Sequence, residues 1–495
     1  MEDDIGTRFM TATSEERLRL VRDGYQGAAL KRHLGEEAYE EYSKLANRVS
    51  RKLDVDHLGV RAPKNLVFVP GIMGSLLQSQ TKGGIWWIDA RTRHHINDLR
   101  LSPDGLADAN ADDQIIPCCV DTSYEPFQTA ILEREDLGHV AFPYDWRKTF
   151  DSNASLLKEQ VVQLYENNGN RPVHLVAHSM GGLLVRATLM NHGQELWPKL
   201  GRLVFIGTPH YGSPAIAGYL KNHLWGFELM ALLGIYLGRE TFRSLWGALS
   251  MLPAPRGVYP GTRPSDPEPW SSDSSGDWYD HPCANFDMYR AENWKLDLTS
   301  EQESQLQTIL TGAAEFHARL YRAHQELRQE LRNRMLVIAG VGYKTLFRLS
   351  YETRFFGRWE HTAKVTSRVE GDRHREGDGR VPLASAELEN VTKRYVRAVH
   401  GGLPNVREVY EDVFSWLGGE SMNLPTSARA ALGAHLAPGA GKSDAPHLDG
   451  TAEASPYSDD PGYWEPEEPA KERINILQDE LERQEVPAFD RVRLL

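Results

Sequence analysis

The chain has 495 residues, of which 40% are hydrophobic and 25% are charged, so it can bury a large core. Its net charge of −13 argues against a nucleic-acid-binding protein, because such proteins gather Lys and Arg against phosphates. Three cysteines, Cys118, Cys119 and Cys283, are too few and too poorly spaced for a disulfide framework or a zinc site. We therefore expect one large globular domain with insertions, or two domains, without a metal or a nucleic-acid partner.

Neither the N-terminus nor any apolar stretch predicts export or a membrane span. Residues 1–4 lack the basic region and apolar run of a secretory signal. The most apolar stretch, 224–237, is interrupted by Glu228 and is shorter than the ~20 apolar residues that a bilayer requires. We expect a cytoplasmic protein in which any membrane contact is peripheral and apolar.

The apolar periodicity changes along the chain. Residues 14–56 carry apolar side chains at steps of three and four, which predicts a helical N-terminal extension over 1–63. From Asn65 onward, strand-like runs alternate with helical patterns such as 152–165 and 180–190. The predicted strands are 66–69, 115–120, 139–142, 173–176, 203–207, 335–340 and 395–399. This alternation predicts an α/β fold with a mostly parallel, doubly wound sheet.

A long insertion interrupts this alternation between residues 214 and 333. We interpret it as a cap or lid that divides the core into a first part, 64–213, and a second part, 334–418. Its apolar side chains at helical spacing include candidate substrate-binding residues, which are Trp225, Phe227 and Met230. A plain hydrophobic core stripe has the same spacing, so that alternative stays open.

The C-terminal part of the chain changes character after the predicted helix 405–417. Residues 419–495 are rich in Ala, Gly, Pro, Ser and acidic residues, which predicts a largely disordered acidic tail. Residues 473–484 have the pattern of a short charged helix. The sequence assigns no function to this tail.

A strand, a sharp turn and a helix are predicted around Ser179, in Ala177-His178-Ser179-Met180-Gly181-Gly182. A strained turn of this kind lifts a serine hydroxyl clear of the backbone and tolerates only small residues two positions to either side. Ala177 and Gly181 meet that requirement. The pattern therefore predicts a nucleophile elbow, although an ordinary Gly-rich strand-to-helix turn has the same residues.

An acid and a base should follow the nucleophile in chain order. Asp378, in the tight loop 377–382, is the predicted acid, and Asp372 in a charged stretch is its rival. His400 follows the last predicted strand and precedes the final helix, so it is the predicted base. His178 and His210 precede the acid, and we interpret them as pocket-lining or structural.

An oxyanion hole requires two preorganised N–H donors. Met180, the residue after the nucleophile, is the first predicted donor, and Ile72 or Met73 in the glycine-rich loop 70–75 is the second. No nucleotide-binding or metal-binding motif is found in the sequence, so we expect no cofactor and no metal.

Several of these segments together resemble a known family. They are Pro70-Gly71-Ile72-Met73-Gly74-Ser75, Pro143-Tyr144-Asp145-Trp146-Arg147, the segment 177–182, Gly207-Thr208-Pro209, Gly377-Asp378-Gly379, His400, and Phe286-Asp287-Met288-Tyr289 through Trp294. In this order they are similar to lecithin:cholesterol acyltransferase and its phospholipid:diacylglycerol acyltransferase relatives, over about residues 64–418. The resemblance implies an α/β-hydrolase fold with a lid, a triad of Ser179, Asp378 and His400, and acyl chemistry on lipid esters.

The chain departs from that family at Trp86-Trp87, where the secreted members have a nearby disulfide and this sequence has no neighbouring cysteine. Membrane docking by that device is not expected here. We predict a lipase, phospholipase or O-acyltransferase that forms an acyl-enzyme on Ser179, with a lipid or other ester as substrate and peripheral membrane contact through the cap. The residues leave the acyl acceptor open. The alternative is a catalytically silent hydrolase-fold scaffold whose N-terminal helices or tail bind a protein partner.

Overall fold

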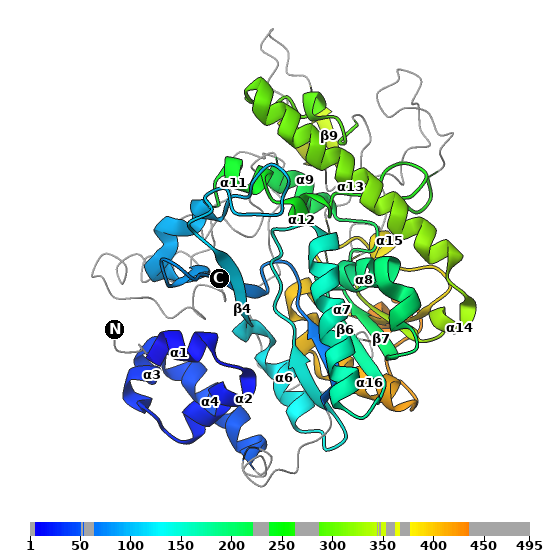
Figure 1. The fold of residues 1–495 in the computed structure, drawn as a ribbon. Coiled ribbons are helices and arrows are strands. Elements are labelled where there is room, and N and C mark those ends of the chain that lie inside the picture. Colours follow the sequence, from blue (N-terminus) through cyan, green and yellow to red (C-terminus); the bar gives the residue numbers. More distant parts are fainter. Residues whose placement is uncertain are drawn as a thin grey trace.

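A central sheet of six strands organises the fold (Figure 1). The computed structural model describes residues 5–50, 53, 64–220, 237–262, 287–343, 345, 348–352, 362–366 and 377–434. The strands lie in the order β11 (Thr392–Val396), β8 (Met335–Gly340), β7 (Leu200–Ile206), β6 (Val173–His178), β1 (Lys64–Val69) and β5 (Gly138–Ala141), and every pair is parallel. Within this sheet, the chain adds β5 on one side of β1 and then β6, β7, β8 and β11 on the other. This doubly wound order confirms the predicted fold class.

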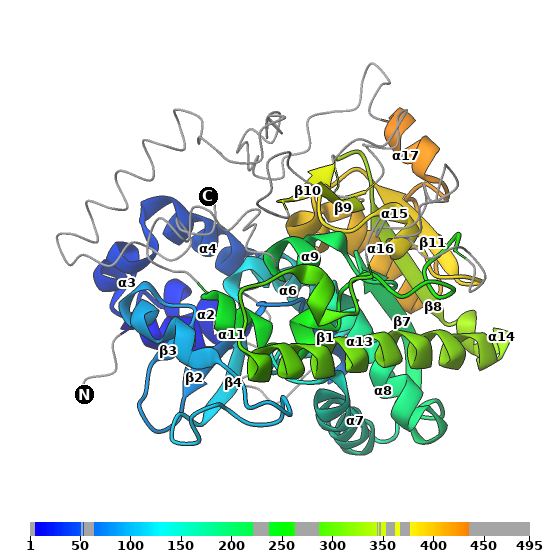
Figure 2. The same cartoon turned by 90° about the horizontal axis from the view of Figure 1, so that it is seen from above.

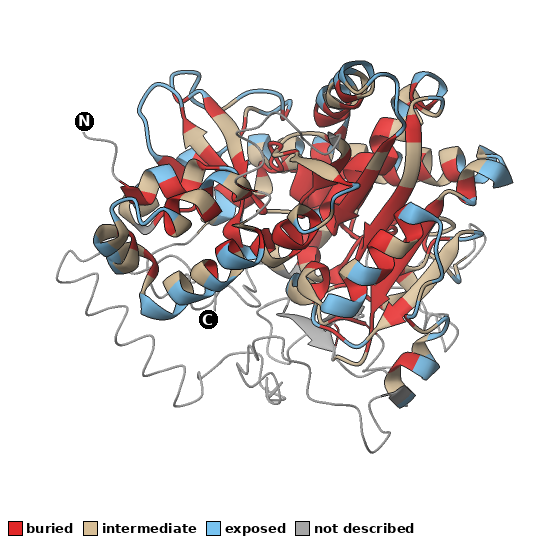
Figure 3. Cartoon of the chain, turned by 90° about the horizontal axis from the view of Figure 1, so that it is seen from below, coloured by how far each residue is buried: buried red, intermediate tan, exposed pale blue. Residues whose placement is uncertain are grey.

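Helices cover both faces of the sheet because successive strand residues point to opposite faces. Leu66 and Phe68 of β1 belong to the apolar cluster that includes α6 (Glu125–Leu132) and α16 (Arg407–Gly418). Val67 and Val69 belong to the cluster that includes α7 (Phe150–Asn167) and α8 (Met180–Leu196). Figure 3 shows the buried strands between these helical layers.

One predicted strand lies outside the central sheet. The strand over 115–120 is present as β4 (Ile115–Val120), but it pairs antiparallel with β2 (Ser75–Ser79), which also pairs with β3 (Ile85–Trp87). The prediction that it belongs to the parallel core was wrong, because an apolar run does not show which sheet a strand joins. A second antiparallel pair, β9 (Arg348–Glu352) with β10 (Thr362–Thr366), was not predicted.

The segment predicted as a cap contains helices between β7 and β8. They are α9 (Pro214–Leu220), α11 (Arg239–Arg243), α12 (Trp246–Leu249), η5 (Ala291–Trp294), α13 (Ser300–Glu326) and α14 (Gln329–Arg332). Figure 2 shows α13 running past α8 toward α14. Phe316 of α13 stacks on Phe150 of α7, with ring centroids 4.6 Å apart, which fixes α13 to the core. Trp225, Phe227 and Met230 lie outside the described residues.

The N-terminal extension consists of short helices beside α6 (Figure 1). They are α1 (Ile5–Thr11), α2 (Ser14–Arg22), α3 (Gly27–Leu34) and α4 (Glu36–Arg48). A capping box between Thr13 and Glu16 starts α2, and Gly35, with φ of +83°, ends α3. In the part of the chain that is described, no helix is both long and apolar enough to span a bilayer.

Residues 419–434 are ordered, which differs from the prediction of a tail that is disordered from 419. Asp412 of α16 is fully buried and accepts hydrogen bonds from the backbone N–H groups of Asn423 at 2.7 Å and Leu424 at 2.9 Å. Beyond them, α17 (Ala428–Ala434) buries Ala431 in a small apolar cluster. A prediction from amino-acid composition cannot detect hydrogen bonds such as those between Asp412 and residues 423 and 424. Residues 435–495, including 473–484, lie outside the described residues.

We expect Asp412→Ala to loosen this segment, because it removes the acceptor of two backbone N–H groups and leaves that of the buried Leu424 unsatisfied, at about 1–3 kcal/mol. Urea unfolding should report lower stability, and limited proteolysis should cut within 419–434 faster. Glu411→Ala is the matched control, since Glu411 is a neighbouring carboxylate that pairs with Arg407 on the surface. Equal cleavage rates in the two variants would contradict the expectation.

Candidate active site

The candidate site lies between β1 and β6, where the order in which strands are added to the sheet reverses. In doubly wound sheets, ligand sites form at the carboxyl ends of the strands at this reversal. Ser179 follows β6 with φ of +51° and ψ of −125°, a strained turn, and its N–H donates to the carbonyl oxygen of Ile206 at 2.9 Å. A side chain at Gly181 would lie 2.4 Å from the carbonyl oxygen of Pro70. Helix α8 therefore packs so closely against the end of β1 that only glycine fits at position 181.

The three predicted triad residues come together at this edge. Nε2 of His400 is 2.8 Å from Oγ of Ser179, and Nδ1 of His400 is 2.8 Å from Oδ2 of Asp378. Because an ionised carboxylate only accepts, Nδ1 carries the proton and Nε2 is free to accept the serine hydroxyl. The Asp378 side chain is 1% exposed and the His400 side chain 14%. This geometry suits proton transfer from Ser179 to His400.

Hydrogen bonds from its own loop fix the Asp378 carboxylate. Its Oδ1 accepts from the N–H groups of Arg380 at 3.0 Å and Val381 at 2.8 Å, which leaves Oδ2 for His400. The N–H of His400 donates to the carbonyl oxygen of Asp378 at 2.8 Å, so the two loops are also joined through the backbone. The rival acid, Asp372, lies outside the described residues.

The predicted oxyanion donors lie on the loop after β1 and on the first turn of α8. Gly74 donates to the carbonyl oxygen of Gly71 at 3.1 Å, and Met73 has φ of +60°, so Ile72 and Met73 occupy the tip of a tight turn. Neither of their N–H groups has a partner among the described residues. Met180 is the first residue of α8, where backbone N–H groups have no partner within the helix and the dipole favours negative charge.

Aromatic side chains after β5 support the loop after β1. The Tyr144 hydroxyl donates to the carbonyl oxygen of Pro70 at 3.1 Å, and the Trp146 indole donates to that of Ser75 at 3.1 Å. The Arg147 guanidinium is completely buried and pairs with Asp145 at 2.7 Å and Asp108 at 2.9 Å. The segment 143–147 therefore holds the loop that carries the predicted oxyanion donors.

Trp86 and Trp87 are core residues. Their exposed fractions are 0% and 3%, and the Trp87 indole donates to the carbonyl oxygen of Met73 at 3.0 Å. The Trp87 ring also packs edge-on against Trp146, with centroids 5.1 Å apart. These side chains are therefore engaged in packing and are not presented to a membrane.

Tyr124, which sequence reasoning missed, contacts the site through His178. Its hydroxyl is 3.0 Å from the N–H of Gly71 and 2.8 Å from Nδ1 of His178, and Nε2 of His178 is 3.0 Å from the carbonyl oxygen of His400. Burial, followed by the proximity of His400, lowers the pKa of His178 well below its ordinary value, and burial raises the pKa of Tyr124. No motif surrounds Tyr124 in the sequence, so only the structure identifies it.

His210 lies in a buried group of basic side chains behind the site. Its carbonyl oxygen accepts from Arg186 at 2.8 Å, and its ring packs edge-on against Phe205. His317 and His324 of α13 are also buried, and Arg186 is close enough to both to lower their pKa values. Among the described residues, no hydrogen bond links the His210 ring to the triad, which agrees with the structural interpretation of this histidine.

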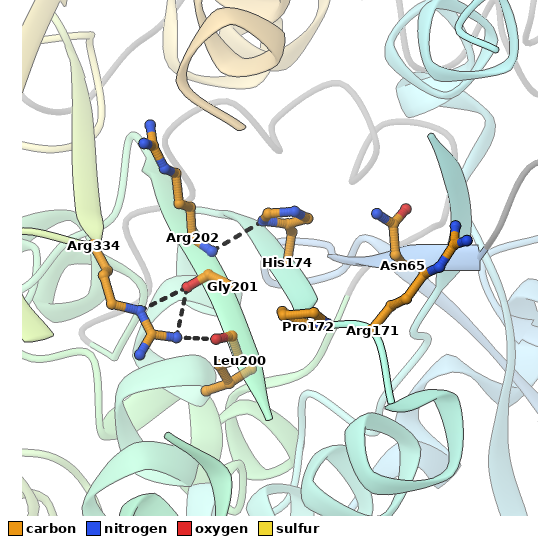
Figure 4. A pocket seen from close by; sticks show the side chains of 8 residues that line it. All are labelled: Asn65, Arg171, Pro172, His174, Leu200, Gly201, Arg202 and Arg334. Carbon is orange, nitrogen blue, oxygen red and sulfur yellow. Dashed lines mark hydrogen bonds between the residues drawn. The ribbon is translucent and has the colours of Figure 1, made fainter. Parts of the chain in front are cut away.

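A cavity of about 490 Å³ lies at the opposite, amino-terminal edge of the sheet (Figure 4). It is lined by Asn65, Arg171, Pro172, His174, Leu200, Gly201, Arg202 and Arg334. Arg334 donates to the carbonyl oxygens of Leu200 and Gly201, and the guanidinium groups of Arg171 and Arg202 extend to opposite sides. Strand β6 separates the cavity from Ser179 by roughly 20 Å. We assign it no part in the chemistry.

The strand order and the strained turn at Ser179 define an α/β-hydrolase. The family model described as lecithin:cholesterol acyltransferase matches residues 132–268, a range that contains Ser179 and ends before Asp378 and His400. Over this range the chain is therefore similar to the lecithin:cholesterol acyltransferase family, which confirms the resemblance seen in the motifs.

Two curated relatives match part of the chain. The uncharacterized protein YJR098C of Saccharomyces cerevisiae is 23% identical over 247 residues, which cover 48% of this chain and 37% of that protein. Phospholipase A(1) LCAT3 of Arabidopsis thaliana is 22% identical over 308 residues, which cover 56% of this chain and 65% of that protein. The matched part is less than two thirds of the length of each relative.

Solved structures are similar at low identity. The Tle4–Tli4 complex aligns at 15% identity with a TM-score of 0.45, over 72% of this chain and 97% of that chain. The mature lipase BlEst2 of Bacillus licheniformis aligns at 15% identity with a TM-score of 0.33, over 72% of this chain and 92% of that chain. The fold assignment accordingly rests on the strand order of this chain.

We expect the free energy of unfolding to fall on acidification. Burial lowers the pKa of His317 and of His324 from an ordinary value of 6.5 to about 4. As the pH falls through 6.5, the unfolded chain binds protons that the folded chain does not, so stability is lost until the pH approaches 4. Urea unfolding should therefore give a smaller free energy at about pH 5 than at about pH 7.

His324→Gln is the matched variant for this measurement. A glutamine can still donate to the carbonyl oxygen of Glu389, which His324 Nε2 approaches to 2.8 Å, but it does not titrate. The difference in unfolding free energy between the two pH values should shrink in this variant. Equal free energies at both pH values in the unmodified protein would contradict the expectation.

Proposed function

We propose that this protein is a serine-dependent lipid acyl hydrolase or O-acyltransferase that works through an acyl-enzyme on Ser179. The observation that carries the proposal is the hydrogen-bonded series from Ser179 to His400 to Asp378 on a strained turn. A serine placed in this way becomes a nucleophile because the neighbouring imidazole accepts its proton as it attacks. The likeness to the lecithin:cholesterol acyltransferase family supports a lipid ester as the substrate.

In the proposed reaction, Oγ of Ser179 attacks the ester carbonyl carbon while its proton passes to Nε2 of His400. The Asp378 carboxylate holds the proton on Nδ1 and stabilises the imidazolium. The N–H of Met180, with that of Ile72 or Met73, donates to the oxyanion of the tetrahedral intermediate. His400 then returns the proton to the leaving alcohol, and the acyl group remains on Ser179.

Water or an alcohol then attacks the acyl-enzyme, with His400 again accepting the proton. Hydrolysis and acyl transfer share every earlier step, so a product analysis distinguishes them. The protein is incubated with a labelled phospholipid and a sterol or diacylglycerol acceptor, and free fatty acid is separated from new ester. A cytoplasmic location, and peripheral membrane contact through the cap, belong to this proposal as expectations.

Ser179→Ala should abolish labelling by a fluorophosphonate probe and should lower ester turnover by at least about 1,000-fold. His400→Gln should have a loss of similar size, because triad residues act as a unit. Circular dichroism and the Tm serve as controls for folding. If the folded protein is not labelled and turns over no ester in a panel of lipids, the silent scaffold that binds a protein partner is the better description.

We expect esters with long acyl chains, or aggregated esters, to be turned over faster than short soluble ones. The reason is the apolar composition of the predicted cap, including Trp225, Phe227 and Met230. Burial of each further CH₂ of the acyl chain is worth about 0.8 kcal/mol, so kcat/KM should rise with chain length. Measuring kcat/KM across p-nitrophenyl esters tests this, and a flat or falling profile would indicate a generic esterase.

A further inference from the structure

The hydroxyl of Tyr124 joins three loops of the candidate active site. It accepts a hydrogen bond from the N–H of Gly71 at 3.0 Å and lies 2.8 Å from Nδ1 of His178. The other ring nitrogen of His178 is 3.0 Å from the carbonyl oxygen of His400. Gly71 begins the loop of the predicted oxyanion donors, His178 precedes Ser179, and His400 is the predicted base. One series of hydrogen bonds therefore connects donor loop, nucleophile turn and base loop.

Counting protons fixes the tautomer of His178. The carbonyl oxygen of His400 can only accept a hydrogen bond, so Nε2 of His178 must be the donor, and in the neutral ring Nδ1 is then left to accept the proton of the Tyr124 hydroxyl. Nδ1 therefore carries no proton, and the proton of the neutral ring lies on Nε2. There it is donated to the carbonyl oxygen of His400. The ring of His178 thus holds the backbone of the residue whose own ring accepts from Ser179.

Arg17 of the N-terminal helix α2 fixes the turn that carries Tyr124. Its guanidinium is fully buried and donates to the carbonyl oxygen of Val120 at 2.9 Å, at the end of β4, and to the carboxylate of Glu125 at 3.1 Å, at the start of α6. The turn 121–124 lies between these two contacts. Two further donors of Arg17 bind backbone carbonyl oxygens of α1, those of Phe9 and Met10. One side chain thus anchors both ends of the turn to the N-terminal helices.

The buried ion pair between Arg17 and Glu125 is not explained by a contribution to folding stability alone. The side chains of Arg17 and Glu125 are 1% and 3% exposed, and the desolvation of two buried charges offsets most of their attraction. Apolar residues of similar volume often replace such a pair without loss of stability. A guanidinium does have one property that apolar residues lack, since its donors set the direction of several partners at once.

We propose that Arg17, Tyr124 and His178 are positioning residues for the reaction proposed above, on which this inference rests. Arg17 sets the turn, Tyr124 sets the orientation of the His178 ring and the position of Gly71, and His178 sets the backbone of His400. The N-terminal helices are then a structural part of the active site. In this role the N-terminal helices support the active site, whereas in the alternative hypothesis they bind a protein partner.

Two sets of variants test the proposal. Tyr124→Phe removes only the hydroxyl, and the double variant Arg17→Met with Glu125→Leu removes the ion pair without leaving a buried charge. Each should lower kcat for an ester by about 10-fold or more with KM changed less than about two-fold, because alignment of the base is lost while the substrate surface is intact. Combining them should lower kcat no further than Tyr124→Phe alone, because they act through one turn.

Matched controls separate positioning from general destabilisation. Arg48→Ala breaks another ion pair between the N-terminal helices and the core, the one to Glu133 at 2.7 Å, but leaves the turn 121–124 untouched. Tyr289→Phe removes another tyrosine hydrogen bond, the one to the carbonyl oxygen of Pro253 at 2.6 Å. Both controls should keep kcat, and the Tm is measured for every variant. A fall in kcat that follows the Tm equally in controls and test variants would overturn the proposal.

A resonance of His178 gives a readout that does not depend on turnover. The proton on Nε2, donated to a buried carbonyl oxygen, should give a downfield imidazole N–H signal that His178→Gln removes. Tyr124→Phe and the double variant should shift or weaken this signal. An unchanged signal together with unchanged kcat would overturn the inference and leave the proposed function intact. Absence of Ser179-dependent turnover in the unmodified protein would instead overturn the proposed function, and the positioning roles with it.

Discussion

The hydrogen bond between Ser179 and His400 is the contact on which the candidate site depends, and it joins residues 221 positions apart in the chain. Nothing local brings them together. The parallel sheet does so, because its strands all end at the same edge and deliver the residues that follow them to one place. The order of β6, β7, β8 and β11 therefore determines the geometry of the candidate site as directly as the residues themselves. Even Gly181 serves this arrangement, since a larger residue there would separate α8 from β1.

Much of the site could be predicted because its signals are local. A strained turn needs small neighbours, which marked Ser179, and chain order after the long insertion pointed to Asp378 and His400. The structure places these three within hydrogen-bonding distance, and their catalytic roles stay a proposal. Tyr124 could not be predicted in this way. Its hydroxyl is useful only because Gly71 and His178, 53 and 54 positions away, pack around it, and no local pattern records such a contact.

In the fold too, features set by the local sequence could be predicted, whereas features set by contacts between distant residues could not. Apolar runs predicted a strand that overlaps each of the six strands of the central sheet, and the inner strands β8, β7 and β6 are largely buried. The edge strands β5 and β11 are less buried, and the prediction of 395–399 overlaps β11 only at its last two residues. The apolar run Ile115–Val120 was likewise predicted as a strand of the parallel sheet, but it joins another sheet, because the sequence of a strand does not show which strand it pairs with. Composition also failed at residues 419–434, where two hydrogen bonds to the buried Asp412 order a segment that has few apolar residues.

The distance along the chain between Ser179 and His400 also bears on synthesis. A ribosome releases the chain from its N-terminus, so the N-terminal helices and β6 are available while 221 further residues are still being added. Over that interval Ser179 lacks its hydrogen-bond partner, because both the imidazole that it contacts and the carbonyl oxygen that His178 contacts belong to residue 400. A nascent chain would thus lack the complete candidate triad until the last strand of its core had been translated.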